Sequence, residues 1–542
     1  MRPWYARSGI TLTTLARVQL AAALLLMLAG LFYILNLETS ARAVKPLQVD
    51  ELYFLTCAAR AVVAESGVVT GCHDNKGPLI YMAYAAGINP DKPFDLIWIK
   101  RAGAGIALLN VFVAACLARL LAGGVAAAVT IIFAISLVMV DPGFMALKTE
   151  SLAILFSLMA TALWVRGLQS GYSLWHHGLA GGLMGLAIMS NQKFGLVLGV
   201  SLIGLVLRGR HVADRIPAKS YQSLLIMLLA IMAGTLLPFM ALVAYFYTQG
   251  RLHDFLASLF LYPSLYGSVA DGSFAQVFAW RLGLVADRLR PFIAHALVIA
   301  GMMVWLTQWF RHRQDASGQP VGFELVALPA VAYFLLCISF SILFSYHFNP
   351  AFLYASVAIG VAYVAILKKL PEETARKTTV FLVLIFSLVQ VLAMWKNSEF
   401  RSKGDDVYAY LPVENQGGYA YVVGQWPAFY AFNQLIPASD VLYPNALSGA
   451  EAAPFFRPPA PGTLKARWLA DLRNTNESKL LADFSRTPPR YIFVIDMMGR
   501  VNTSEPSNMS IINRYIAERC SFSKRVTGYS AIYDGSLYVC QT

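Results

Sequence analysis

Two adjacent carboxylates, Asp50 and Glu51, are the first side chains along this sequence whose type and spacing could do chemistry. A carboxylate within hydrogen-bond reach of a hydroxyl group can take its proton as a general base. The residues after the pair, 52–65, have helical periodicity, so a structural alternative exists. Acids in the first turn of a helix complement its dipole by ~0.3–1 kcal/mol each. Taken alone, the pair favours this structural alternative.

A lysine in a polar turn forms the second cluster. Lys76 is followed by Gly77 and Pro78, which hold the turn open, and Asp74 precedes it. A flexible ammonium group at such a position can bind a phosphate as a point charge. The alternative is a turn lysine that only reaches into solvent, and the turn by itself does not separate the two.

The third cluster, Lys148, Thr149 and Glu150, stands at the start of an apolar block. In the structural alternative, Thr149 or Ser151 is a helix cap. Lys148 and Glu150 are then an exposed ion pair that contributes little to stability. A catalytic interpretation therefore depends on the elements that position these clusters.

The composition indicates a polytopic α-helical membrane protein. Of 542 residues, 57% are apolar and 13% charged, whereas soluble domains average roughly 25% charged residues. The apolar residues fall into blocks of about 17–25, the length that crosses ~30 Å of hydrocarbon. The net charge is +13, but the basic residues sit in short clusters between the blocks, which argues against a nucleic-acid partner.

The pattern predicts about eleven transmembrane helices. The first block follows several arginines, so a secretory signal peptide is the alternative. The block is long for a signal peptide and no convincing cleavage site closes it, so we expect a retained helix. The predicted spans are 16–36, 102–121, 124–140, 150–167, 178–190, 194–208, 221–247, 291–310, 325–344, 350–367 and 378–396.

The basic residues set the orientation. They gather in alternate gaps, most densely at 208–219 and 368–377, and these gaps are expected to face the cytoplasm. The long segments 37–101 and 398–542 then lie outside. We expect one membrane module, residues 1–397, which includes the loop 37–101, and one extracytoplasmic domain, residues 398–542.

The extracytoplasmic domain is expected to be a small α/β domain. Apolar runs predict strands at 419–423, 491–495 and 531–539. Between them, the stretches 465–473 and 511–519 have helical character.

Four of the six cysteines, Cys57, Cys72, Cys520 and Cys540, lie in the segments predicted to be outside. An oxidising compartment favours two local disulfides, Cys57–Cys72 and Cys520–Cys540. Four free thiols are the alternative, since sequence alone does not fix connectivity.

Membrane proteins of this shape are most often transporters, which place ionisable residues inside their spans near the midplane. Here the spans are almost free of Asp and Glu, and the acids gather at outer span ends and in outer loops. This distribution favours a site at the outer membrane interface. A lipid or oligosaccharide transporter or flippase stays open as an alternative, as does a wall-polymer ligase.

Taken together, the three clusters resemble the GT-C class of polyprenyl-phosphate-sugar-dependent glycosyltransferases, above all aminoarabinose lipid A transferases and protein O-mannosyltransferases. Asp50 and Glu51 match the Asp-Glu motif of the first outer loop in that class. Residues 75–79 match its Lys-Pro-Pro-Leu turn, and Lys100-Arg101 matches an arginine that opens the next span. Thr149-Glu150 matches the second acidic position.

Two weaker matches and several departures accompany this resemblance. Residues 185–193, ending at Lys193, look like a Gly-Leu-Ala-X-X-X-Lys stretch, and residues 346–350 resemble a His-Tyr-X-X-Pro motif. An asparagine, Asn75, precedes the turn lysine where relatives often have Glu, although Asp74 could substitute. Gly77 replaces the first proline, and the second acid is Glu150 where Asp is common.

The resemblance implies an inverting glycosyltransferase that moves a sugar from a polyprenyl phosphate to an extracytoplasmic acceptor. Asp50 would be the general base. Lys76 and Arg101 would stabilise the departing lipid phosphate. Glu51 and Glu150 would orient the acceptor or hold a divalent cation, and no other cofactor is expected. Further substrate contacts would come from Asp74, Tyr81, Lys193, Tyr346 and His347.

The same resemblance implies a multi-pass protein of the inner (plasma) membrane, surrounded by membrane lipids, whose active site faces the periplasm or exterior. The absence of a Gly-rich phosphate loop fits a donor that is not a nucleotide. The acceptor could be an envelope lipid such as lipopolysaccharide lipid A, a glycan or a protein.

Overall fold

The structure is a computed structural model. It describes residues 49–64, 76–140, 142–170, 173–213, 219–261, 299–304, 322–339, 345–367, 417–424, 428–442, 461–495, 510–526 and 535–541, with a few single positions between them. The chain divides into two compact units. The first contains residues 100–242 and 270–403, and the second contains residues 46–99, 243–269 and 404–542. Each unit is described by itself.

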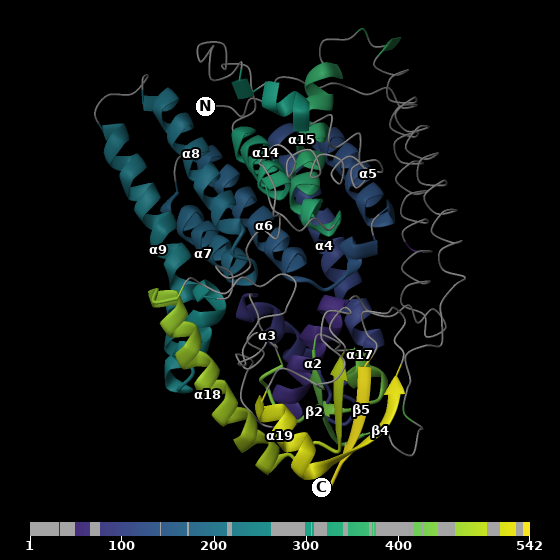
Figure 1. Ribbon diagram of the computed structural model, residues 1–542. Helices are drawn as coiled ribbons and strands as arrows, with labels where there is room; N and C mark the ends of the chain where they lie inside the picture. The colour runs from purple at the N-terminus through teal and green to yellow at the C-terminus, as the bar shows by residue number, and fades with distance from the viewer. Residues whose placement is uncertain are drawn as a thin grey trace. The chain divides into compact units, whose positions relative to one another are not determined.

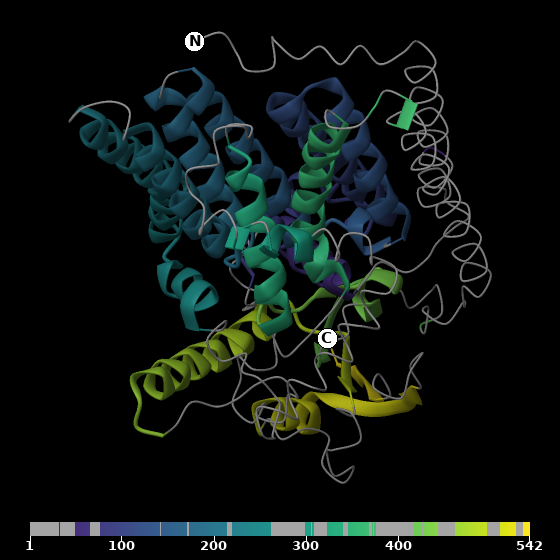
Figure 2. The same cartoon turned by 90° about the horizontal axis from the view of Figure 1, so that it is seen from above.

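The first unit is a bundle of apolar helices (Figure 1). Its helices are α4 (Leu96–Ala122), α5 (Gly124–Val140), α6 (Thr149–Gln169), α7 (Leu174–Ser190), α8 (Phe194–Ala213), α14 (Glu324–Ser339), α15 (Asn349–Leu367) and the first part of α9 (Lys219–Thr248). Seen from above, these blue to green helices lie side by side (Figure 2). Packed pairs include α6 with α7, α8 with α14, and α15 with both α14 and α5.

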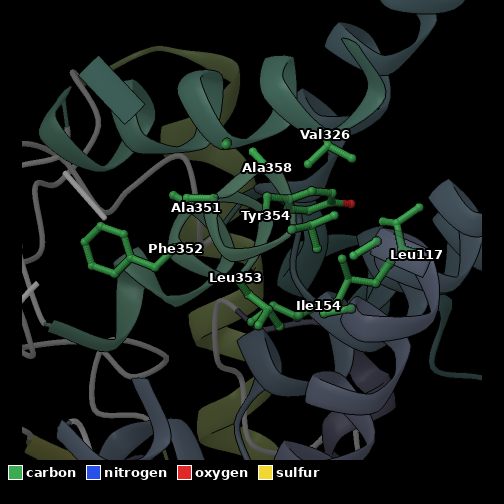
Figure 3. Packing of buried hydrophobic residues seen from close by; sticks show 14 of the residues in the cluster. Leu117, Ile154, Val326, Ala351, Phe352, Leu353, Tyr354 and Ala358 are labelled. Carbon is green, nitrogen blue, oxygen red and sulfur yellow. The ribbon is translucent and has the colours of Figure 1, made fainter. Parts of the chain in front are cut away.

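Small residues allow the closest of these approaches. A Cβ on Gly360 of α15 would lie 2.4 Å from the carbonyl oxygen of Ala126 in α5, so only glycine fits there. The side chain of Thr130 adds a hydrogen bond to the carbonyl of Ser356, at 3.3 Å. Figure 3 shows Ile154 of α6 and Tyr354 of α15 among the buried side chains of this core.

The described helices confirm a mostly helical membrane protein. Four of them are long and apolar enough to cross a membrane, namely α4, α6, α15 and the part of α9 at Gln222–Thr248. The helices α5, α7, α8 and α14 also fall on predicted spans, and three of them carry shorter apolar stretches, at Gly124–Val138, Phe194–Val206 and Glu324–Ser339. The predicted spans 16–36 and 378–396, and most of 291–310, lie outside the described residues. The predicted count of eleven is therefore reproduced in part.

The second unit contains a five-stranded sheet in the order β2-β1-β3-β5-β4. The strands are β1 (Tyr419–Val423), β2 (Ile436–Pro437), β3 (Tyr491–Ile495), β4 (Cys520–Val526) and β5 (Gly535–Cys540). β2, β1 and β3 are parallel, while β5 and β4 are antiparallel. The predicted strands β1 and β3 are found at the predicted residues, and β5 is shifted by a few residues.

Helices cover both faces of this sheet. Tyr421 of β1 contacts Phe484 of α18 (Leu464–Arg486), with ring centroids 5.1 Å apart. Phe493 of β3 stacks on Phe429 of α17 (Ala428–Phe432), also at 5.1 Å. Val422, not Tyr421, pairs in register with Phe493, so the two aromatic contacts lie on opposite faces. Phe484 also contacts Tyr515 of α19 (Ser510–Arg519), so α19 lies on the α18 face.

Two further segments pack within this second unit, which differs from the expected division at residue 397. Helix α2 (Val49–Val63) packs on α17 and β2, and it also packs on α3 (Pro78–Gly87). The short helix α10 (Leu252–Leu256) and the π-helix η3 (Ala257–Leu261) pack against α18. The physical reason is apolar burial, because Ala257 and Leu261 form a cluster with Leu469 and Leu472 of α18.

Partly buried polar contacts fix the same junctions. Arg60 at the end of α2 donates to the hydroxyl of Thr487, at 3.2 Å. Arg251 Nη2 lies 3.0 Å from Asp440 Oδ2, and Lys479 of α18 contacts the other oxygen of Asp440. These bonds join stretches that lie far apart in the sequence.

Cysteine pairing in the second unit agrees with the expectation where the structure describes it. A disulfide joins Cys520 and Cys540, which are register partners in β4 and β5. Cys57 in α2 is also disulfide-bonded, and its expected partner Cys72 lies outside the described residues.

Candidate active site

The acidic pair lies in the first turn of α2. Asp50 is half-buried, and Glu51 is 4% exposed. The buried face of α2 holds the pair in place, because Phe54 makes edge contacts with Tyr81 and Tyr84 of α3 at 5.4 and 5.8 Å. The half-buried Asp50 is thus the more accessible of the two carboxylates.

The charges of both carboxylates act on the pKa of Tyr84. Its phenol is fully buried, and burial together with the charges of Glu51 and then Asp50 raises its pKa well above the ordinary value. The phenol is therefore neutral and adds no third negative charge beside the two acids. Tyr84 was not among the residues expected at the site, and in the sequence only its position one helical turn after Tyr81 pointed to it.

Lys76 is half-buried and lies two residues before the start of α3. The helix begins with Pro78 at its first position, and Gly77 is its extended N-cap residue. A proline at that position suits a helix start, since its missing N–H would have no intrahelical partner. The start of α3 therefore fixes the backbone beside Lys76. Tyr81 is buried in the packing of α3 on α2.

Arg101 lies in the second turn of α4, which begins at Leu96. Its side chain is exposed. The sequence placed it at the opening of a span, so the helix starts earlier than expected. Asp95 explains this start, because its Oδ1 accepts hydrogen bonds from the backbone N–H groups of Ile97 and Trp98.

The third cluster is buried. Lys148 is 2% exposed and Glu150 4%, so the two are no exposed surface pair. Thr149 begins α6, but the N-cap residue is Lys148 and it makes no side-chain capping bond. Burying charged groups is costly unless other groups compensate them. The structural alternatives considered for this cluster are therefore wrong.

Glu150 is held from two sides. Thr149 Oγ1 donates to Glu150 Oε2 at 2.9 Å, and Asn191 Nδ2 donates to Thr149 Oγ1 at 3.4 Å. On the other side, His347 Nε2 lies 3.9 Å from Glu150 Oε1. Asn191 belongs to the turn between α7 and α8 that also carries Lys193. The structure thus brings Glu150, His347 and the Lys193 turn together in the first unit.

A small polar cavity adjoins Glu150. Lys148, Ser151 and the asparagines Asn110 of α4 and Asn349 of α15 line it, and it has room for about one water-sized group. The side-chain oxygens of Asn110 and Asn349 are buried and accept no hydrogen bond from any residue that the structure describes. Polar residues within apolar blocks were the signal that could have identified them.

Two other expected site residues, Asp74 and Tyr346, cannot be placed with the rest. Asp74 lies outside the described residues, as does the side chain of Tyr346, whose backbone belongs to the 3-10 helix Ser345–Phe348. Within the described ranges, no three His, Cys, Asp or Glu side chains gather as a metal site would require. Whether the site uses a divalent cation stays a prediction.

No protein-family model matches this sequence, and no curated protein matches it significantly. Solved structures do match. ArnT from Cupriavidus metallidurans bound to undecaprenyl phosphate is 14% identical with a TM-score of 0.53, over 97% of this chain and 98% of that chain. Its apo state gives the same values. An oligosaccharyltransferase of Archaeoglobus fulgidus matches at 11% identity and a TM-score of 0.46, over 87% of this chain and 69% of that chain.

The ArnT match covers nearly the whole of both chains, so it includes the helical bundle and the C-terminal sheet alike. At this identity it shows the fold, and a fold by itself does not define an activity. The resemblance inferred from three short clusters is confirmed at that level: this chain has the fold of a GT-C glycosyltransferase.

Proposed function

We propose that this chain is an inverting glycosyltransferase that moves a sugar from a polyprenyl phosphate to an acceptor on the extracytoplasmic side of the inner membrane. One observation carries the proposal: the motif residues of that class occur in a chain that has its fold. The ArnT structure with 97% coverage of this chain holds undecaprenyl phosphate. The buried Glu150 and the acidic pair on α2 support it further.

In the proposed reaction, Asp50 takes the proton of an acceptor hydroxyl as that oxygen attacks the anomeric carbon. The bond from that carbon to the phosphate oxygen breaks at the same time, so its configuration inverts. The polyprenyl phosphate leaves with its negative charge, which Lys76 and Arg101 compensate. Such preorganised charges are usually the largest single contribution to catalysis.

The two other acids have supporting roles. The charge of Glu51 raises the pKa of the neighbouring Tyr84, and Thr149 donates a hydrogen bond to Glu150. We propose that both acids orient an acceptor hydroxyl. Tyr81, Lys193 and His347 are proposed to contact substrate, as are Asp74 and Tyr346. No step of this scheme passes through a metal ion. An envelope lipid, a glycan or a protein could each offer the acceptor hydroxyl.

The test compares envelope glycolipids and glycans by mass spectrometry in cells that lack this protein and in cells that carry it. We expect one species to gain the mass of a sugar only when the intact protein is present. Asp50→Asn should abolish that gain while the protein still accumulates in the membrane. The matched control is Asp471→Asn, which makes the same change at an exposed position of α18.

An unchanged envelope profile would contradict the proposal, as would full activity of Asp50→Asn together with full activity of Glu150→Gln. Loss of the modification in the control variant as well would show that the assay reports expression and not chemistry.

A further inference from the structure

A chain of hydrogen bonds runs from the turn between α7 and α8 to the carboxylate of Glu150. The backbone N–H of Lys193 donates to Asn191 Oδ1 at 3.1 Å. Asn191 Nδ2 donates to Thr149 Oγ1 at 3.4 Å, and Thr149 Oγ1 donates to Glu150 Oε2 at 2.9 Å. Asn191, Thr149 and Glu150 are 5%, 1% and 4% exposed, so solvent does not replace these partners.

The direction of this chain is fixed at its first bond. A backbone N–H can only donate, so Asn191 must turn its oxygen toward Lys193 and its amide nitrogen toward Thr149. The hydroxyl of Thr149 accepts that bond and therefore has its single hydrogen left for Glu150. Hydrogen bonds that share one direction polarise and strengthen each other in a buried setting.

The two oxygens of the Glu150 carboxylate therefore have different neighbours. Oε2 is occupied by Thr149, and Oε1 is the oxygen that faces His347, 3.9 Å away. A carboxylate held in this way already has a fixed conformation, so the reaction does not have to restrict its side chain. Misplacement of such a group by about 1 Å can cost 10²-fold in rate.

We propose that Asn191 and Thr149 are positioning residues for Glu150 in glycosyl transfer, an inference that rests on the proposed function. Neither side chain is expected to touch substrate. Asn191 acts through Thr149, and Thr149 acts by holding one carboxylate oxygen so that the other is presented to the reactants. A purely structural role, tying α6 to the α7–α8 turn, would affect stability without selective loss of turnover.

The experiment uses the purified full-length protein in lipid vesicles, with a polyprenyl-phosphate sugar as donor and the acceptor found by mass spectrometry. Thr149→Val keeps the shape of the side chain and removes its hydroxyl. We expect kcat to fall about 10-fold to 100-fold, with KM for the donor within about 2-fold because Thr149 is not expected to touch the donor. Thr149→Ser restores the hydroxyl and should recover most of kcat.

Asn191→Leu should lower kcat in the same way. The double variant Thr149→Val/Asn191→Leu should be no worse than the poorer single variant by more than about 2-fold, since both changes interrupt one chain. The matched control is Ser190→Ala. Ser190 is the buried neighbour of Asn191, and among the described residues its hydroxyl bonds only to the carbonyl of Leu186 in its own helix, 2.9 Å away.

Several results would overturn the inference. If Thr149→Val keeps its kcat and has a lowered unfolding temperature, these hydrogen bonds contribute to stability alone. A rise in the donor KM alone would place Thr149 in contact with the donor. If the kcat losses of the two single variants multiply in the double variant, Asn191 and Thr149 do not act through one series of hydrogen bonds. If the unchanged protein transfers no sugar at all, the proposed function fails and the positioning role fails with it, whereas an active protein with an active Thr149→Val variant refutes the positioning role alone.

Discussion

Asp50→Asn is designed to separate chemistry from folding. The substitution keeps the shape of the side chain and removes its basicity. The structure places Asp50 half-buried in the first turn of α2, where the lost charge weakens the helix-dipole interaction by ~0.3–1 kcal/mol. Domains are stable by roughly 5–15 kcal/mol, so the variant should remain folded.

The expected loss of rate is much larger. General-base catalysis contributes about 10²–10⁴-fold, which is roughly 2.7–5.5 kcal/mol in the activation barrier. Glu51→Gln should show the opposite balance. Glu51 is 4% exposed and its charge raises the pKa of the buried Tyr84 more than that of Asp50 does, so its neutralisation should disturb packing more and turnover less.

The assay measures initial rates of sugar transfer in vesicles, with the unfolding temperature of each variant recorded in parallel. Asp50→Asn should lose at least about 100-fold in kcat while its unfolding temperature stays near that of the unchanged protein. The reasoning is refuted if Asp50→Asn turns over at the normal rate while Glu150→Gln is inactive, because the base would then lie on α6. Equal, small losses in Asp50→Asn and Glu51→Gln would instead support the helix-dipole role for both acids.

Four further predictions follow from the same contacts. Lys76→Ala should weaken use of the lipid donor more than use of the acceptor, measured as separate KM values, and an effect on the acceptor alone would place Lys76 elsewhere. Asp440→Asn removes the shared partner of two basic side chains that are 19% and 27% exposed, so unfolding should become easier by ~1–3 kcal/mol, whereas Asp471→Asn should have no effect. Alkylation without reduction should leave Cys520 and Cys540 unlabelled, and labelling of both would disprove their disulfide. A reporter that is active only outside the cytoplasm should be active at the C-terminus, and a silent but well-expressed fusion would reverse the predicted orientation.

The sequence by itself determined the elements that depend on local pattern. Apolar blocks long enough for a membrane became α4, α6, α9 and α15, because burying or lipid-exposing a continuous apolar surface needs no information from distant residues. The strands β1 and β3 were equally readable, since both are buried central strands with continuous apolar runs. β4 was missed because it is an edge strand with mostly exposed polar residues, and its pairing with β5 decides that it is a strand.

Tertiary structure decided what surrounds the functional groups. An exposed Lys148–Glu150 pair was one alternative that the sequence left open, and the packing of α4, α6 and α15 around these residues decides that they are buried. Asn191 is 42 residues from Thr149, and Asp440 is 189 residues from Arg251. No local sequence pattern could therefore predict either hydrogen bond. Hydrophobic periodicity reports which face of an element is apolar, but it carries no information on which polar side chain from another element will meet it. For this reason the motifs could name Glu150, whereas the residues that hold it came from the fold.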